Sequence, residues 1–232
     1  MATVYKITKA VGEGVKVGEN VEADVRVVQT LLADFFTPAD VGDPVIAVTG
    51  ICDANTIEGI KFFQKLFWPK PDGKIDPNGN TFKKLVAAVA LNFAPLPQSG
   101  TVGYYTYSAS PRQWGTEKAI ESLKSVASQF SVKKPGVNIG IGDISFRLGG
   151  KMSPHDSHQK GKNVDIRPIR TDGSQEPVSI DDKAYSSEDT KTLVELLIAD
   201  ANVKSILFND SKIPNVTYYK GHHNHLHVNF KE

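Results

Sequence analysis

The chain has 232 residues, of which 40% are hydrophobic and 23% are charged, so it can form one large domain or two small ones, and wholesale disorder is excluded. The formal net charge of +1 argues against a general nucleic-acid-binding protein, and no apolar run approaches the roughly 20 residues of a membrane span. The single cysteine, Cys52, excludes a disulfide framework and a cysteine-ligated zinc site.

Residues 1–92 have the pattern of a small helical module. Apolar residues recur at helical spacing from Val25 to Leu32 and from Ile57 to Phe67. A third helix is predicted over 81–91, after a turn at 71–73. Four apolar side chains are expected in the core of this module: Val28, Leu32, Ile60 and Phe63.

Residues 93–112 mix Pro, Gly, Ser and Tyr and have no helical period. This composition predicts a linker that leads into a second domain over 113–232.

The second domain has a mixed α+β pattern. A helix is predicted over 116–130, capped by Thr116, and another over about 187–200, where Ser186 and Asp189 resemble a capping box. Alternation of apolar and polar residues predicts four strands, near 137–141, 163–167, 203–208 and 225–230. We therefore expect a small antiparallel sheet with flanking helices.

All six histidines fall in two short windows of this second domain. The two windows contain His155 and His158, and His222, His223, His225 and His227. Because structural histidines would be scattered, this concentration predicts that the two windows meet at one metal ion.

The alternation around the histidines indicates which side chains converge. If the apolar residues of both strands face the core, Asp165, His225 and His227 share the opposite face. Gly161 allows the preceding loop to fold back, so that His158 becomes a third ligand. Three ligands of this type without a thiolate suit zinc with a fourth position open for water, which is typical of a catalytic site. His225 is then expected to act as general base or acid.

These motifs resemble those of the zinc peptidases grouped as lysostaphin, D-Ala-D-Ala peptidase and hedgehog relatives, and most closely the penicillin-insensitive murein endopeptidases. The first motif is a His, six residues and an Asp, here His158 and Asp165, and the second is His-x-His, here His225 and His227. The resemblance implies that His158, Asp165 and His227 bind one Zn²⁺ and that His225 is the catalytic base.

Further residues are candidates for the same site. The resemblance implies that His155 lines it as a substrate-binding residue and that His222 contributes to catalysis. Arg147, on the loop before the first motif, is a candidate for stabilising the oxyanion or holding a substrate carboxylate, with a surface salt bridge as the alternative. Asn163 departs from the family, which often has Asp there, and its role stays open.

The helical module resembles the three-helix peptidoglycan-binding module. The resemblance rests on four segments: Val25–Leu32, Gly50–Thr56, Ile60–Gln64 and Asp72–Pro77. It implies docking to the glycan or stem peptide of the cell wall.

Together the two resemblances imply a zinc-dependent hydrolase that cleaves peptide cross-links of bacterial peptidoglycan. Two alternatives remain, a carboxypeptidase or L-Ala-D-Glu peptidase on the same substrate, and a non-catalytic wall-binding protein. The relatives with the first of these activities usually have Ser two residues before the first motif, where this chain has Asp156.

The first twelve residues contain two lysines but no apolar run after them, so no secretory signal is expected there. We expect synthesis in the cytoplasm and action on the wall after holin- or secretion-system-dependent delivery. This route is typical of an endolysin or of an interbacterial effector, and an effector would have an immunity protein as partner.

Overall fold

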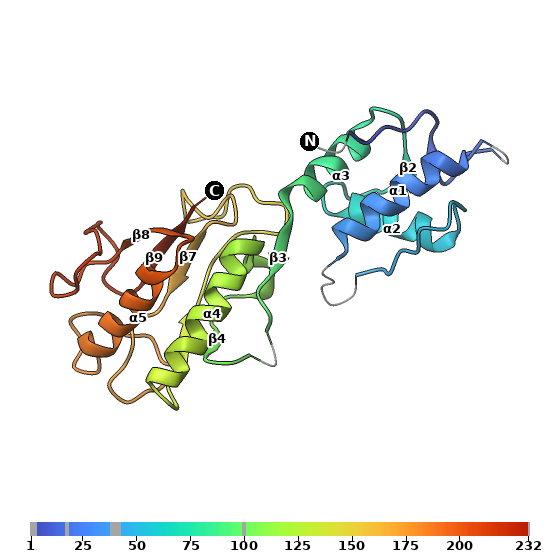
Figure 1. The fold of residues 1–232 in the computed structure, drawn as a ribbon. Coiled ribbons are helices and arrows are strands. Elements are labelled where there is room, and N and C mark those ends of the chain that lie inside the picture. The colour runs from blue at the N-terminus through green and yellow to red at the C-terminus, as the bar shows by residue number, and fades with distance from the viewer. Residues whose placement is uncertain (1–3, 17–18, 38–42, 99–100, 232) are drawn as a thin grey trace. The chain divides into compact units, whose positions relative to one another are not determined.

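Residues 4–16, 19–37, 43–98 and 101–231 are described by the computed structural model, in which the chain divides into two units, Met1–Asn92 and Phe93–Glu232 (Figure 1). None of the described helices combines the length and apolar character that a membrane span requires.

The first unit contains the three expected helices and a short ribbon. Its elements are β1 (Val11–Gly12), α1 (Glu22–Phe35), α2 (Ala54–Lys65), β2 (Lys74–Ile75) and α3 (Asn80–Leu91), and β1 pairs antiparallel with β2. The four apolar side chains predicted for its core are fully buried. Asp53 caps α2, because its carboxylate accepts a hydrogen bond from the backbone N–H of Thr56 at 2.8 Å.

Two buried glutamines fix the loops of the first unit. The side-chain oxygen of Gln29 accepts from the N–H of Gly50 at 2.8 Å, and that of Gln64 accepts from the N–H of Gly73 at 2.9 Å. Both glycines have positive φ, so both loops turn where only glycine fits without strain. The amide groups of the two glutamines donate to the chain beyond each loop, which ties each helix to the next.

The second unit is built on a five-stranded sheet with the order β4-β6-β7-β9-β8. Its strands are β4 (Tyr104–Thr106), β6 (Ile139–Ile141), β7 (Asn163–Ile166), β8 (Val203–Leu207) and β9 (Leu226–Phe230). A separate antiparallel pair consists of β3 (Phe93–Pro95) and β5 (Trp114–Thr116), and η1 (Ser110–Arg112) precedes β5.

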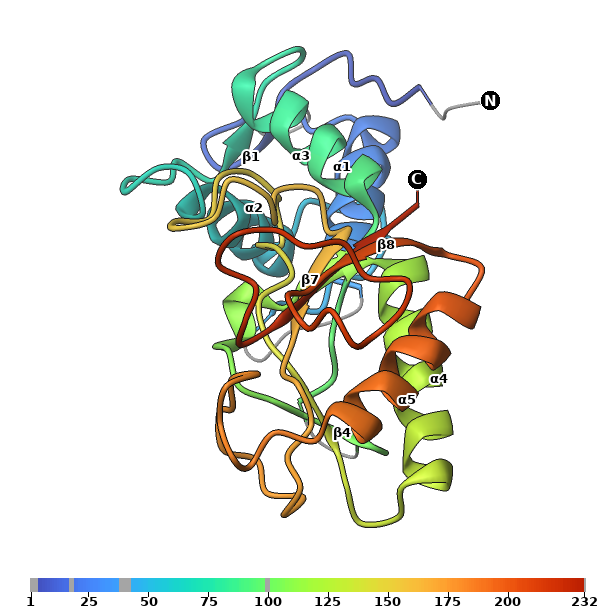
Figure 2. The same ribbon diagram turned by 90° about the vertical axis from the view of Figure 1, so that its left-hand side faces the viewer.

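Helices α4 (Glu117–Lys133) and α5 (Ser187–Ala199) lie side by side against the sheet (Figure 2). Their apolar faces share one core with the inward side chains of the strands. Both predicted caps are confirmed, since Thr116 accepts from the N–H of Ala119 at 3.3 Å and Ser186 accepts from the N–H of Asp189 at 3.2 Å. The helices occupy one face, which leaves the other face of the sheet for polar side chains.

Two sequence predictions need correction. Residues 93–112 do not form a linker, because they contribute β3, β4 and η1 to the second unit, where Leu96 and Tyr104 are buried. Pro, Gly and Ser are frequent in turns and edge strands as well as in linkers, so composition did not separate the two. The sheet is mixed rather than antiparallel, since β4 pairs parallel with β6 after the crossover through α4.

Candidate metal centre

The pairing of β7 with β9 brings Asp165 and His227 together. The two residues are direct register partners, and Nδ1 of His227 lies 3.0 Å from Oδ1 of Asp165. Their apolar neighbours along both strands are buried in the core below. Asp165 and His227 are themselves only 6% and 5% exposed. The predicted alternation on both strands is therefore confirmed.

The loop before β7 adds His158 to this pair. Gly161 has a φ of +64°, and a Cβ there would meet Phe93 and the backbone of Thr116 at 2.9 Å. His158 itself has a φ of 59°, a left-handed conformation that is costly for a non-glycine residue. Its ring is fully buried, with Nε2 at 3.2 Å from Oδ1 of Asp165.

The hydrogen bonding of His158 indicates a site for a cation. Its Nδ1 donates to the backbone oxygen of Ile144 at 3.1 Å, which leaves a lone pair on Nε2. That buried Nε2 has no hydrogen-bond partner among the described residues and faces the carboxylate of Asp165. Two lone pairs at this distance repel each other, so either a proton or a metal ion must lie between Nε2 and the carboxylate oxygen. The donor set therefore fits a metal ion.

The electrostatics of Asp165 agree with a cation site. Burial disfavours the charged carboxylate, but the imidazoles of His158 and His227 outweigh it and hold the pKa of Asp165 well below its usual range. The carboxylate is therefore ionised at neutral pH and available as a ligand.

His155 lies beside the same carboxylate but has a partner of its own. One ligand atom each of His155, His158 and Asp165 lies within 4.8 Å of the others, so these three could also hold an ion. Nε2 of His155 is 2.9 Å from Oδ2 of Asp143 and 4.0 Å from Oδ2 of Asp165. Nε of Arg112 donates to Oδ1 of Asp143 at 2.8 Å. Asp143 thus anchors His155 to one side of the centre.

His222 and His225 approach the centre from the loop before β9. The N–H of Asn209 donates to the carbonyl of His222 at 2.9 Å, which fixes this loop to the end of β8. Nε2 of His225 lies 3.9 Å from Oδ1 of Asp165, and the ring centroid of His222 lies 4.7 Å from that of His225. Burial lowers the pKa of His225 to about 4, so its imidazole is neutral at pH 7 and can accept a proton.

Asn163, the departure from the family pattern, also lies at this face. Its amide donates to Oδ1 of Asn229 at 2.7 Å and lies 3.4 Å from Nε2 of His227. It therefore lies beside His227 at the edge of the centre.

Arg147 lies in a different environment from the histidines. Its guanidinium carbon is 4.6 Å from the centroid of the Trp114 ring. It is not among the side chains that line the pocket at the centre. The catalytic role predicted for Arg147 thus has no support from this geometry.

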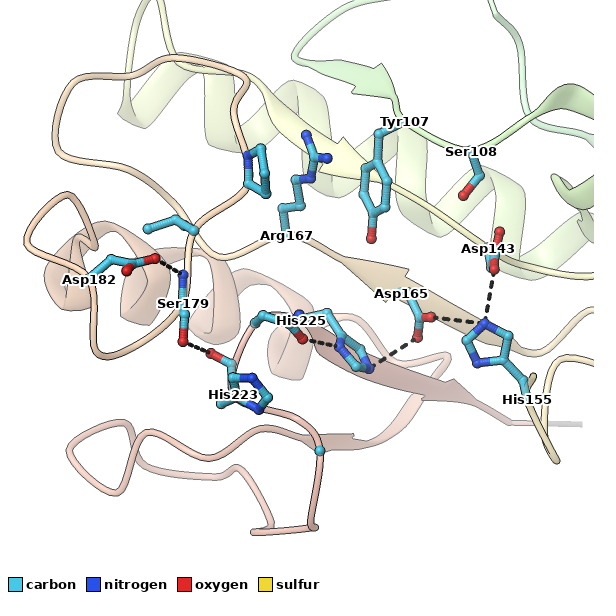
Figure 3. A pocket seen from close by; sticks show the side chains of 14 residues that line it. Tyr107, Ser108, Asp143, His155, Asp165, Arg167, Ser179, Asp182, His223 and His225 are labelled. Atoms are coloured by element: carbon cyan, nitrogen blue, oxygen red, sulfur yellow. Dashed lines mark hydrogen bonds and ion pairs between the residues drawn. The ribbon is translucent and has the colours of Figure 1, made fainter. Parts of the chain in front are cut away.

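A pocket of about 670 Å³ opens onto the centre (Figure 3). Asp165, His155 and His225 point into it from one side, and Tyr107 and Arg167 stand together on another. Its other lining residues are Ser108, Asp143, Pro177, Val178, Ser179, Asp182, Gly221, His223 and Asn224.

Sequence reasoning did not identify Asp143, Arg112, Tyr107 or Arg167 as parts of the site. The contact between Arg112 and Asp143 joins residues 31 positions apart, and no local pattern marks it. For Asp143, the sequence signal that could have been used is the Gly-Asp-Ile run that contains it.

Two comparisons with known proteins bear on this site. The sequence model of the penicillin-insensitive murein endopeptidases matches residues 89–206, half of the chain. The matched segment contains His155, His158 and Asp165 but ends before His225 and His227. No curated protein matches the chain.

Proposed function

Because the chain belongs to the penicillin-insensitive murein endopeptidase family, we propose that it is a zinc-dependent hydrolase of the peptide cross-links in bacterial peptidoglycan. The family is one of metallopeptidases that act on murein. The observation that carries the zinc proposal is the buried Nε2 of His158, which has no hydrogen bond among the described residues and lies 3.2 Å from Oδ1 of Asp165.

The proposed zinc ligands are Nε2 of His158, the carboxylate of Asp165 and Nδ1 of His227. Oδ1 of Asp165 lies 3.2 Å from the first nitrogen and 3.0 Å from the second. His155 is the competing third ligand, but its Nε2 already has Asp143 as partner at 2.9 Å. We therefore assign His155 to the substrate side of the pocket.

When bound, zinc would supply a Lewis acid for the scissile carbonyl and a hydrolytic nucleophile at neutral pH. His225 carries out the proton transfers, because its neutral imidazole lines the pocket and lies within 3.9 Å of Asp165. Asn224 orients His225, since its Oδ1 lies 2.8 Å from Nδ1 of that ring. His222 packs against His225 and supports its position.

The first unit is proposed to dock the protein on the cell wall. Support comes from its three-helix architecture and from the loops that Gln29 and Gln64 fix. A small pocket of about 220 Å³ lies beside Gln64 and is lined by Trp68 and Asp72 among others. An aromatic ring beside polar groups suits a sugar or peptide ligand.

The protein is further proposed to act as an endolysin or an interbacterial effector, made in the cytoplasm and delivered to the wall. An immunity protein would accompany an effector.

Analysis of muropeptides after digestion, with and without a chelator, tests the proposed activity. We expect cross-linked dimers to disappear and monomers to accumulate, and the chelator to prevent both changes. Loss of terminal D-Ala alone would indicate a carboxypeptidase. Cleavage between L-Ala and D-Glu would indicate the other alternative, and wall binding without released amines would indicate a non-catalytic protein.

A further inference from the structure

Arg167 stands next to the metal centre on the same face of the sheet. It follows β7, and its N–H donates to the carbonyl of Gly140 at 2.9 Å, which continues the pairing with β6. Residues two apart on a strand point to the same side and lie about 6.6 Å apart. Arg167 thus follows Asp165 along the strand, and both line the same pocket (Figure 3).

A platform of two tyrosines holds the guanidinium group of Arg167. Its central carbon lies 4.2 Å from the ring centroid of Tyr107 and 6.0 Å from that of Tyr105. Nη1 also donates to the carbonyl of Gln175 at 2.6 Å. Aromatic stacking and this hydrogen bond pre-organise the planar group.

Two glycines in and just after strand β6 leave space for the two tyrosine rings. A Cβ at Gly142 would lie 2.4 Å from the ring of Tyr107, and one at Gly140 would lie 2.6 Å from the hydroxyl oxygen of Tyr105. A side chain at either position would therefore collide with one of the two tyrosines. The arrangement is built into the backbone and is more than a chance surface contact.

The guanidinium group of Arg167 has no ion-pair partner in the part of the chain that the structure describes. By contrast, the nearby Arg112 and Arg170 pair with Asp143 and Asp172. Arg167 is the only arginine or lysine among the described residues that line the pocket. A half-buried, pre-organised guanidinium next to a hydrolytic centre is suited to bidentate binding of a carboxylate.

We propose that Arg167 binds a carboxylate of the peptidoglycan stem peptide beside the scissile bond and so selects substrates with a free carboxylate over amidated ones. This inference rests on the proposed function. It assigns Arg167 a role in specificity, with Tyr107 as its positioning residue.

The test measures kcat/KM on a soluble cross-linked muropeptide and on the same muropeptide after amidation of its carboxylates. With wild-type protein, amidation should lower kcat/KM by about 10- to 100-fold, the effect of losing a hydrogen bond to a charged group. Arg167→Gln should cause a similar loss on the free carboxylate and little further loss on the amidated substrate. Arg167→Lys should fall between, because it keeps the charge but not the planar fork.

Arg170→Gln is the matched control, since Arg170 is paired with Asp172 and does not line the pocket. It should leave the preference for the free carboxylate unchanged. Zinc content and unfolding temperature of Arg167→Gln should equal those of the wild type.

The inference is overturned if wild-type protein cleaves both substrates equally well, or if Arg167→Gln lowers both rates by the same factor. In either case the hydrolase proposal survives. Failure of the wild-type protein to cleave either substrate would instead contradict both proposals.

Discussion

His158 combines three features that rarely coincide in one side chain. It is fully buried, its backbone is left-handed with a φ of 59°, and its Nε2 has no hydrogen-bond partner among the described residues. A non-glycine residue in this conformation costs on the order of 1–3 kcal/mol. The loop before β7 holds His158 in this conformation, which brings its Nε2 to 3.2 Å from Oδ1 of Asp165.

The proposed separation of metal binding from proton transfer predicts the behaviour of His225→Ala. This variant should keep its zinc but lose about 10²- to 10⁴-fold in kcat, which is the usual contribution of a general base. Zinc content and muropeptide turnover, measured on the same preparation, check the prediction.

Lys220→Ala is the control for His225→Ala, because Lys220 is exposed on the same loop and does not line the pocket. It should retain both zinc and turnover. Loss of zinc from His225→Ala would contradict the assignment, since it would make His225 a ligand.

At the scale of elements, the sequence predicted those parts whose signal is local. The caps at Thr116 and Ser186 mark the starts of α4 and α5 because each side chain bonds its own first turn. The alternation around Asp165 and His227 predicted β7 and β9 because each strand has one face in the core.

Elements whose stability comes from distant partners could not be predicted in this way. Strands β3 and β4 have three residues each and form through pairing with β5 and β6. The cluster of Arg112, Asp143 and His155 and the stacking of Arg167 on Tyr107 likewise depend on the tertiary fold. The spacing of these residues along the sequence does not indicate that they are in contact.

The turn after β8 lies between the start of α5 and the loop that bears His222 and His225. The carboxylate of Asp210 accepts hydrogen bonds from the hydroxyls of Tyr185 at 2.7 Å and Ser187 at 2.8 Å, and from the N–H of Lys212 at 2.9 Å. Burial opposes the charged form of Asp210, but these hydrogen bonds outweigh it and lower the pKa.

Asp210→Ala should therefore lower the free energy of unfolding at pH 7 by about 1–3 kcal/mol, because three partly buried donors lose their acceptor. The folded-state pKa lies below the unfolded value of about 3.9, so this stabilisation is complete above roughly pH 4 and is lost as the pH falls through the folded-state pKa. The difference from the wild type should accordingly be smaller at pH 2.5 than at pH 5 in urea titrations.

Asp181→Ala serves as the control for Asp210→Ala, because Asp181 is exposed in a neighbouring loop. Its unfolding midpoint should match that of the wild type at both pH values. A difference between Asp210→Ala and wild type that stays constant with pH would contradict the electrostatic explanation.

At the scale of the whole molecule, the centre joins two segments that are far apart in sequence. His158 and Asp165 come from the loop and strand before α5, and His227 comes from β9 after it. The family match ends at residue 206, so the register of β9 against β7 is the observation that places His227 at the centre. The residues described at this centre all belong to the second unit.

The central claim is that His158, Asp165 and His227 bind one zinc ion. His155 is not a ligand in this account, because its Nε2 is paired with Asp143. Zinc content per chain in wild type, His227→Ala and His155→Ala, after loading with zinc and desalting, tests it most directly. We predict one zinc ion per chain in wild type and in His155→Ala, and none in His227→Ala. A zinc-free wild type, or zinc retained by His227→Ala and lost from His155→Ala, would contradict the account.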